Sequence, residues 1–326
     1  MIFQATALSS PPAHGLSDDS SPAARAPVLT PGRPVGEALR AMAGHLLREA
    51  HDILADERRD GATAVHDIRK ELKRWRALLR LLAPFLDDSS ERLRADARTL
   101  AGKLSAARDA QSALDAFHDA VDATLHLPPT LPPQSLVTIH SRLEDLRKSH
   151  QASLWDEETR QQLSDYVTAA AYQVSHWSLA GIGFGDLADR LATTYRRARR
   201  ALPDNFESAQ AEDLHELRRR VIEHRYQMEL VEPAWPRLGR IWVDEAQRLR
   251  NRLGAFQDLH ILTQMAAPHH PLAAWRSRLM PLIAYRQAEH AKAAARVAAR
   301  LFAEPPKAFR RRLEALWAAQ DGADAV

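Results

Sequence analysis

A short basic sequence pattern occurs twice in this chain of 326 residues. It begins with His-x-x-Arg and has a second Arg seven residues after the first, once in 66–76 and again in 215–225. Arginine suits phosphate because its planar guanidinium donates two parallel charge-assisted hydrogen bonds, whereas lysine supplies a mobile point charge. Histidine near a helix start can also donate to a phosphate, and it gains charge at mildly acidic pH. The repeated pattern therefore predicts two cationic surfaces for a polyanion.

The two copies are 149 residues apart, as His66 and His215 show. The same offset, without a gap, relates later pairs: Lys103 with Arg252, Leu104 with Leu253, Asp109 with Asp258, and Pro84 with Pro233. Several shared positions in a single register indicate an internal duplication, because one shared pattern alone can arise by chance.

The basic residues of the first copy are predicted to share one side of a helix. At about 100° per residue they fall within an arc of about 80°. They are His66, Arg69, Lys73, Arg76 and Arg80. Apolar residues cluster on the adjoining arc: Ile68, Leu72, Trp75, Leu79 and Leu82. An ordinary solvated face mixes charges of both signs, so this stripe favours an anion site beside the core. The alternatives are a solvated basic face and, for the two histidines, helix capping or packing.

The second copy is a weaker version of the first. It keeps His215, Arg218, Arg219 and Arg225. However, Ile222 occupies the position of Lys73, and Glu229 occupies the position of Arg80. We therefore expect the two halves to be unequal, with the first half holding the anion more strongly.

Composition favours a helical protein without disulfides. The chain is 45% hydrophobic, contains only 12 Gly and no Cys, and is rich in strong helix formers such as Ala, Leu, Arg and Glu. The net charge is only +3, so an anion site must come from charges sorted onto one surface. No apolar run approaches the ~20 residues of a membrane span, and the start lacks the basic n-region of a signal peptide. We expect a cytoplasmic protein without a membrane partner.

Apolar residues recur at helical spacing after Pro34, which predicts an all-α fold of two antiparallel bundles. Helices are expected at 34–58, 62–86, 89–126 and 134–178, then at 186–202, 208–235, 237–266 and 269–303, with a last helix at 307–320. The predicted organisation is a disordered tail (1–33), a first four-helix repeat (34–180), a Gly-rich linker (181–185), a second four-helix repeat (186–303), and a C-terminal helix and tail (304–326).

These features together resemble the CHAD domain, the conserved histidine α-helical domain. Segments 104–109 and 253–258 resemble the family's Leu-Gly-x-x-Arg-Asp signature, and 225–230 resembles its Arg-Tyr-x-x-Glu-Leu signature. The resemblance covers roughly residues 34–303 and implies two four-helix bundles related by a pseudo-twofold axis. It also implies basic helices that line a central cavity or groove, binding of inorganic polyphosphate, and association with polyphosphate granules.

Position by position, the resemblance implies a set of ligand residues. In the first half they are His66, Arg69, Lys73 and Arg76, and in the second half His215, Arg218 and Arg225. The predicted set also includes Lys70, Arg80 and Arg219 on the same two helices, and Lys103, Arg108 and Arg252 as secondary candidates. Ile222 stands at a position that is usually basic in the family, so the resemblance also implies an asymmetric site.

Other kinds of site have weaker support in the sequence. Glu212 and His215 have the spacing of a di-iron ligand pair, but Thr63 is the repeat equivalent of Glu212, so the second pair is missing. The Gly-x-Gly-x-Gly at 181–185 lacks the spacing of a dinucleotide fingerprint, and no phosphate-binding loop motif is present. We therefore expect a binding protein rather than an enzyme, with no catalytic residue, metal or cofactor.

Two alternative partners remain open. Nucleic acid is also a polyphosphate chain and would use the same stripe, but single-strand binding usually adds exposed aromatic residues, and Trp75 falls on the apolar side of its helix. The other alternative is a scaffold for other granule proteins, for which Trp275 and Trp317 are the candidate contacts, although both are more typical of helix packing.

Overall fold

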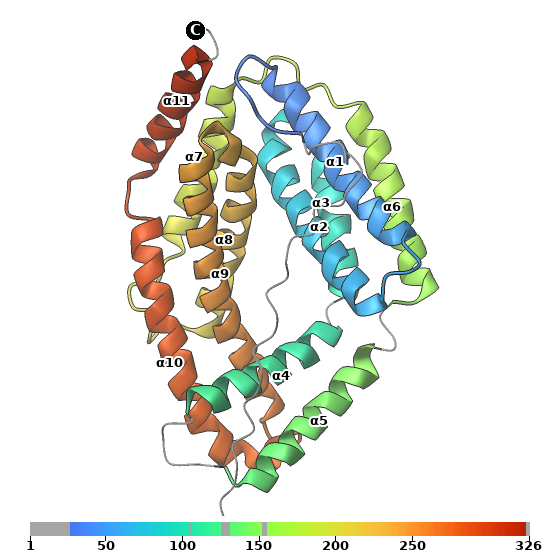
Figure 1. Ribbon diagram of the computed structural model, residues 1–326, viewed down its shortest axis with the longest axis vertical. Helices are drawn as coiled ribbons and strands as arrows, with labels where there is room; N and C mark the ends of the chain where they lie inside the picture. The colour runs from blue at the N-terminus through green and yellow to red at the C-terminus, as the bar shows by residue number, and fades with distance from the viewer. Residues whose placement is uncertain (1–26, 105, 125–130, 152–154, 324–326) are drawn as a thin grey trace, which may run out of the picture.

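The computed structural model describes residues 27–104, 106–124, 131–151 and 155–323, and every regular element in these ranges is helical (Figure 1). The predicted all-α fold is confirmed. The α-helices are α1 (Val35–Ala55), α2 (Gly61–Leu82), α3 (Ser89–Lys103), α4 (Ala106–Ala123), α5 (Pro133–Gln151), α6 (Glu157–Ser175), α7 (Phe184–Arg200), α8 (Ala211–Val231), α9 (Pro236–Met265), α10 (Arg276–Leu301) and α11 (Pro306–Ala323). Short 3₁₀ turns occupy Ala83–Phe85, Glu232–Ala234 and Ala273–Trp275. None of the described helices is long and apolar enough to cross a bilayer.

The helices form two bundles that stand side by side in Figure 1. One contains α1, α2, α3 and α6, and the other contains α7 to α11. The two repeated basic helices, α2 and α8, pack on each other between the bundles. Gln227 of α8 is fully buried there, and its Nε2 donates to the backbone oxygen of Ala77 in α2 at 3.0 Å. The duplication therefore brings the two basic helices together at the bundle junction.

Two of the predicted helices are each two helices in the structure. The predicted helix 89–126 is interrupted after Lys103 and gives α3 and α4, and the predicted helix 134–178 gives α5 and α6. Helices α4 and α5 leave the first bundle, and α4 packs against α9 and α10 of the second. Their apolar sides share a separate core with those helices, which includes Phe117, Leu143, Leu259 and Ile283. Periodicity shows that this stretch is amphipathic, but not which partner buries its apolar side.

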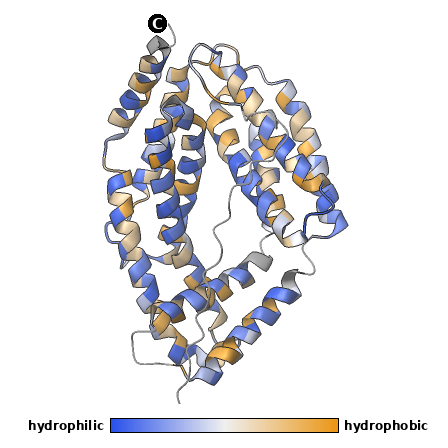
Figure 2. Ribbon diagram, in the orientation of Figure 1, coloured by the Kyte–Doolittle hydropathy of each residue, from blue (hydrophilic) through white to orange (hydrophobic). Residues whose placement is uncertain are grey.

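Helix α2 begins where a side chain satisfies its first backbone donors. The carboxylate of Asp60 accepts hydrogen bonds from the amides of Ala62 and Thr63 at 3.0 and 3.1 Å. The predicted apolar stripe is buried throughout: Ile68, Leu72, Trp75, Leu79 and Leu82. Figure 2 shows the alternation of apolar and polar residues along the helices of both bundles. Burial of this stripe fixes the rotation of α2, and with it the direction of the basic residues.

The two ends of the chain add to the core. Of the predicted tail, residues 1–26 lie outside the described residues, and within 27–33 the side chain of Leu29 is fully buried in the core whereas Val28 and Arg33 are exposed. Helix α11 confirms the predicted C-terminal helix. Its Phe309 stacks on Tyr195 with ring centroids 4.3 Å apart, and its Trp317 stacks on Phe184 at 4.1 Å. Trp317 is therefore a packing residue, and Phe184, within the predicted linker, begins α7.

Candidate anion-binding site

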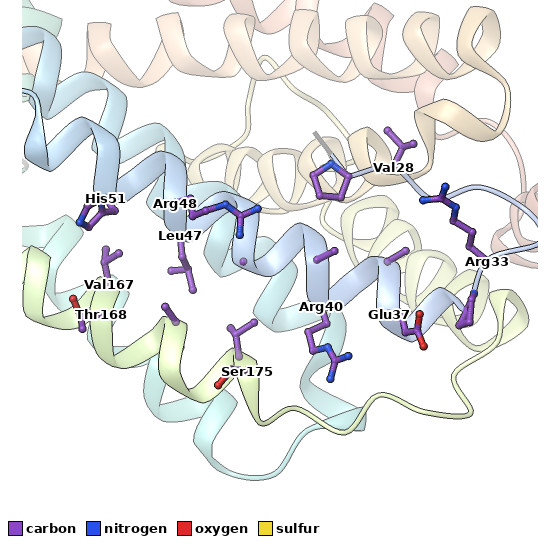
Figure 3. A pocket seen from close by; sticks show the side chains of 17 residues that line it. Val28, Arg33, Glu37, Arg40, Leu47, Arg48, His51, Val167, Thr168 and Ser175 are labelled. Atoms are coloured by element: carbon purple, nitrogen blue, oxygen red, sulfur yellow. The ribbon is translucent and has the colours of Figure 1, made fainter. Parts of the chain in front are cut away.

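A groove of about 1050 Å³ runs along α1 and α6 (Figure 3). Val28, Leu47 and Val167 give it apolar surface, and Arg40 and Arg48 reach its edge. None of the predicted ligand residues lines this groove. The repeated basic helices converge elsewhere, so the groove is not the site that the sequence indicates.

A cavity of about 410 Å³ lies where α2 and α3 of the first bundle face α8 of the second. We call it the central basic cavity. Its eight Arg and Lys residues are Arg69, Lys73, Arg76, Arg80, Arg94, Arg98, Arg219 and Arg220. His215 also lines it, and Glu223 is the one carboxylate among the described residues of its wall. This excess of positive charge on one concave surface suits an anion.

Arg76 has the least compensated charge in the cavity. Burial lowers its guanidinium pKa, and the positive charges of Arg80, Arg98, Arg94 and Arg219 lower it further. Its Nε is buried without a hydrogen-bond partner among the described residues. A buried charge without a counter-charge is costly, so an anion in the cavity would stabilise this arrangement.

One ion pair crosses the cavity between the bundles. Arg80 Nη1 of α2 lies 2.9 Å from Glu223 Oε2 of α8, and Arg220 Nη1 lies 3.9 Å from the same oxygen. Burial raises the pKa of Glu223 and lowers that of Arg80, against the attraction between them. The free energy needed to remove both charges from water therefore offsets part of the free energy gained from their attraction. The pair links the two bundles. Outside the wall, Glu216 also lies 3.0 Å from Arg219 and 2.6 Å from Arg220, and Glu91 pairs with Arg94, so the described carboxylates offset part of the charge of the eight cations.

Arg69 both lines the cavity and closes the end of α3. Its Nη1 donates to the backbone oxygens of Ala101, at 3.3 Å, and of Leu104, where α3 stops. Its repeat equivalent, Arg218, is only 7% exposed and packs against Gly254 in the middle of α9. Both arginines therefore contact the equivalent helix of their own repeat. Arg69 contacts the end of α3, whereas Arg218 contacts the middle of α9, which continues past the equivalent position.

His215 sits at the α8 side of the cavity. Burial lowers its pKa, and the nearby charges of Arg218 and Arg219 lower it further, although a hydrogen bond with Gln257 acts in the opposite direction. Its imidazole is therefore neutral at pH 7. Since an anion would stabilise the protonated form, binding at this position would be coupled to proton uptake.

The structure brings six of the predicted residues together in the cavity wall: Arg69, Lys73, Arg76, Arg80, His215 and Arg219. Ile222 lies there too, opposite the α2 stripe. Three further cations that sequence reasoning missed complete the wall: Arg94, Arg98 and Arg220. The four-residue spacing of Arg94 and Arg98 on one predicted helix was the available signal. Arg197 of α7 also acts electrostatically on Arg80 and Glu223.

The remaining predicted residues lie outside the wall of this cavity. His66 and Lys70 are exposed on α2, and the ammonium of Lys103 donates to Gln162. Arg225 pairs with Glu229 at 2.6 Å. The others are Arg218, described above, Arg252, which lines a different cavity, and Arg108, whose side chain lies outside the described residues.

Comparisons with known proteins agree with this architecture. The family model of the CHAD domain matches residues 37–267. The solved structure "PptA from Streptomyces chartreusis" is similar to 83% of this chain and 100% of its own, with a TM-score of 0.59 and 17% identity. The CHAD domain from the plant Ricinus communis covers 84% of this chain and 95% of its own, with a TM-score of 0.56 and 19% identity. A search of curated proteins found no match. At these identities the two structures support the fold.

Proposed function

The chain belongs to the CHAD domain family, and from this premise we propose that it binds inorganic polyphosphate in the central basic cavity. The observation that carries the proposal is the cavity wall itself, in which eight Arg and Lys residues from α2, α3 and α8 surround a single carboxylate. Guanidinium groups bind phosphate oxygens through paired, charge-assisted hydrogen bonds. The sequence resemblance to the family implies the same ligand.

The layout of the cations favours a phosphate chain over a single phosphate. Arg69, Lys73, Arg76 and Arg80 extend over about 16 Å of α2, at a rise of 1.5 Å per residue. Cations of α3 and α8 flank this row. One phosphate can reach only a few of these groups, whereas a chain can contact many of them at once. The binding energy is thus distributed over many contacts, as for other polyanions.

Nucleic acid is the alternative polyanion, and the composition of the wall disfavours it. Single-strand binding proteins add aromatic side chains on which bases stack. No aromatic residue is among the described residues that line the cavity. We therefore propose that nucleic acid is the weaker ligand.

We also propose that the protein binds its ligand without turning it over. Among the described residues of the wall, His215 and Glu223 are the only titratable groups other than Arg and Lys, and Glu223 is engaged by Arg80. The described residues also contain no group of three or more His, Asp or Glu placed to hold a metal ion. A cytoplasmic location at polyphosphate granules, and contact with other granule proteins, are part of the proposal through the family resemblance.

The test is a competition experiment with the full-length protein and fluorescently labelled long-chain polyphosphate. At fixed salt, unlabelled polyphosphate should displace the probe, single-stranded DNA should do so less well, and orthophosphate should not. Affinity should fall linearly on a log–log plot as salt rises, because bound cations of the polyanion are released. A salt-independent affinity, or equal competition by orthophosphate, would contradict the proposal.

A further inference from the structure

A second basic cavity, of about 480 Å³, shares no lining residue with the first. It lies between α9 and α10, where α4 contributes one residue to the wall. We call it the α9–α10 cavity. Five arginines line it: Arg248 and Arg252 of α9, a second pair of Arg296 and Arg300 of α10, and Arg286 of α10, which lies nearer α4. In each pair the residues are four apart, so they project from the same side of the helix about 6 Å from each other along its axis.

Carboxylates offset only part of this charge. Glu245 lies 2.6 Å from Arg248 Nη1 and 3.7 Å from Arg300 Nη2. Arg252 and Arg296 make no ion pair within the part of the chain that the structure describes. Between the arginines, the wall consists of small residues such as Ala255 and Ala293. The cations therefore lie on two facing helices, and the small side chains between them leave room for a ligand in the cavity.

The end of the cavity at α4 is a preorganised polar cluster. Asp119 of α4 accepts two hydrogen bonds from Arg286, at 2.9 and 2.7 Å, and lies 2.8 Å from His290 Nε2. Burial alone would raise the pKa of Asp119, but His290 and Arg286 hold it well below its usual value. The carboxylate is therefore ionised, and its charge is balanced within the cluster.

His290 provides an independent sign of a missing ligand. Its side chain is almost fully buried, at 3% exposure, and it lines the cavity. With Nε2 directed at Asp119, its Nδ1 is buried without a hydrogen-bond partner among the described residues. Buried polar atoms normally have partners.

The duplication does not account for this cluster. At the 149-residue offset that relates α3 and α4 to α9, Arg248 corresponds to Thr99 and Asp119 to Pro268. The cavity also needs α4, which reaches the second bundle only because the first repeat is interrupted. The site is therefore particular to one half of the molecule and built from both repeats.

We propose that the α9–α10 cavity is a second anion site, which binds a short oligophosphate independently of the central basic cavity. The guanidinium groups of the two facing arginine pairs offer more hydrogen-bond donors than one carboxylate can accept, so a ligand with several phosphate groups fits better. The inference uses the ligand chemistry of the proposed function but none of its residues, so either one can fail without the other.

The experiment is calorimetric titration of the full-length protein with tripolyphosphate. The wild type should bind two equivalents, and Arg252→Glu with Arg296→Glu should remove one of them, with a loss of at least about tenfold in affinity at that site. Arg76→Glu with Arg98→Glu should remove the other equivalent, and the four changes together should abolish binding. The matched control is Arg237→Glu with Arg278→Glu, which reverses one exposed arginine on each of α9 and α10 outside the cavity and should leave two equivalents.

Melting temperatures establish that each variant is folded, and Arg252→Gln with Arg296→Gln replaces the Glu pair if that pair is unstable. One equivalent in the wild type that disappears with Arg76→Glu and Arg98→Glu would overturn the second site. Equal losses in the Arg252/Arg296 and Arg237/Arg278 pairs would also overturn it, because they would indicate a general surface charge effect. If Arg76→Glu with Arg98→Glu still binds two equivalents, while Arg252→Glu with Arg296→Glu loses one, the proposed function would be overturned and this inference would stand.

Discussion

The central basic cavity and the region related to it by the 149-residue offset occupy equivalent places in a duplicated chain, yet their charges differ. Among the described residues, eight basic residues and one acidic residue line the cavity, whereas the positions equivalent to these nine carry four basic and two acidic residues. The charged equivalents are Lys70, Arg74, Arg218, Arg225, Glu71 and Glu229. We call these positions the counterpart region.

Two cations of the counterpart region, Arg225 and Arg74, form ion pairs with its carboxylates. Glu229 lies 2.6 Å from Arg225 Nη2 and 3.6 Å from Arg74 Nε, and Glu71 lies 3.1 Å from Arg74 Nη1. The positions of Glu229 and Glu71 correspond to Arg80 and Arg220 in the cavity. The sign is also reversed at a third pair of positions, Glu223 and Arg74, and the excess of basic over acidic residues falls from seven at the cavity positions to two in the counterpart region. Duplication copies the positions, but a few acidic residues decide which copy keeps charge for a ligand.

The largest effect should come from reversing two cations of the cavity wall, the partly buried Arg76 and its neighbour Arg98. We expect Arg76→Glu with Arg98→Glu to weaken long-chain polyphosphate binding by roughly a hundredfold or more, since each charge-assisted contact contributes about 1.5–3 kcal/mol. Fluorescence anisotropy with labelled polyphosphate measures the loss. Arg237→Glu with Arg278→Glu makes the same change in net charge at exposed positions outside both cavities, and it should have little effect.

Arg69 and Arg218 occupy equivalent positions of the two repeats, but only Arg69 lines the central basic cavity. Arg69→Ala should lower the free energy of unfolding by about 1.5–3 kcal/mol, because the charged donor to two α3 carbonyls is lost, and it should also weaken binding. Arg218→Ala should destabilise the protein similarly, since this arginine is buried, but leave affinity nearly unchanged. Denaturant unfolding and anisotropy measure the two quantities. If Arg69→Ala and Arg218→Ala lost affinity equally, Arg218 would contact the ligand, and the two repeats would contribute equally at this position.

A smaller effect is expected at the pair Lys73 and Ile222, which both line the cavity. Lys73→Ile should weaken polyphosphate binding, and Ile222→Lys should strengthen it, each by about three- to tenfold, with the log–log salt slope changing by about 0.7–0.9. Ile222 is partly exposed, so a lysine there can remain solvated. A stable Ile222→Lys variant with unchanged affinity and slope would show that this position does not reach the ligand.

The smallest effect should be a pH dependence from His215. Its pKa is below the usual value in the free protein, and a bound anion would raise it, so the complex takes up a proton. Affinity should therefore rise as pH falls through the histidine range, by about two- to threefold, and be flat above it. His215→Gln should remove this component, while His66→Gln, which changes an exposed residue outside the cavity wall, should retain it.

Local pattern was sufficient to predict the helices of the second half and the orientation of α2. The stripe of Ile68, Leu72 and Trp75 is buried as predicted, and the adjoining Arg76 and Arg80 point into a cavity. The interruption after Lys103 was not predictable in this way. No Pro marks it, and although Gly102 lies beside it, a single Gly does not by itself predict a break, since Gly254 lies inside the continuous α9. Helix α3 ends there because Arg69 binds its carbonyls and α4 finds its apolar partner in the other bundle.

The sequence by itself determined the helical class, the duplication and the row of cations on α2, because each follows from periodicity or from residue spacing within one segment. Tertiary structure decided which cations share a cavity and which are neutralised. Arg94 and Arg98 join the site only because α3 packs beside α2, whereas Arg74 meets Glu229 only because α2 packs on α8. Charge compensation acts over a few ångströms between segments far apart in the chain, so it depends on packing that no local pattern contains.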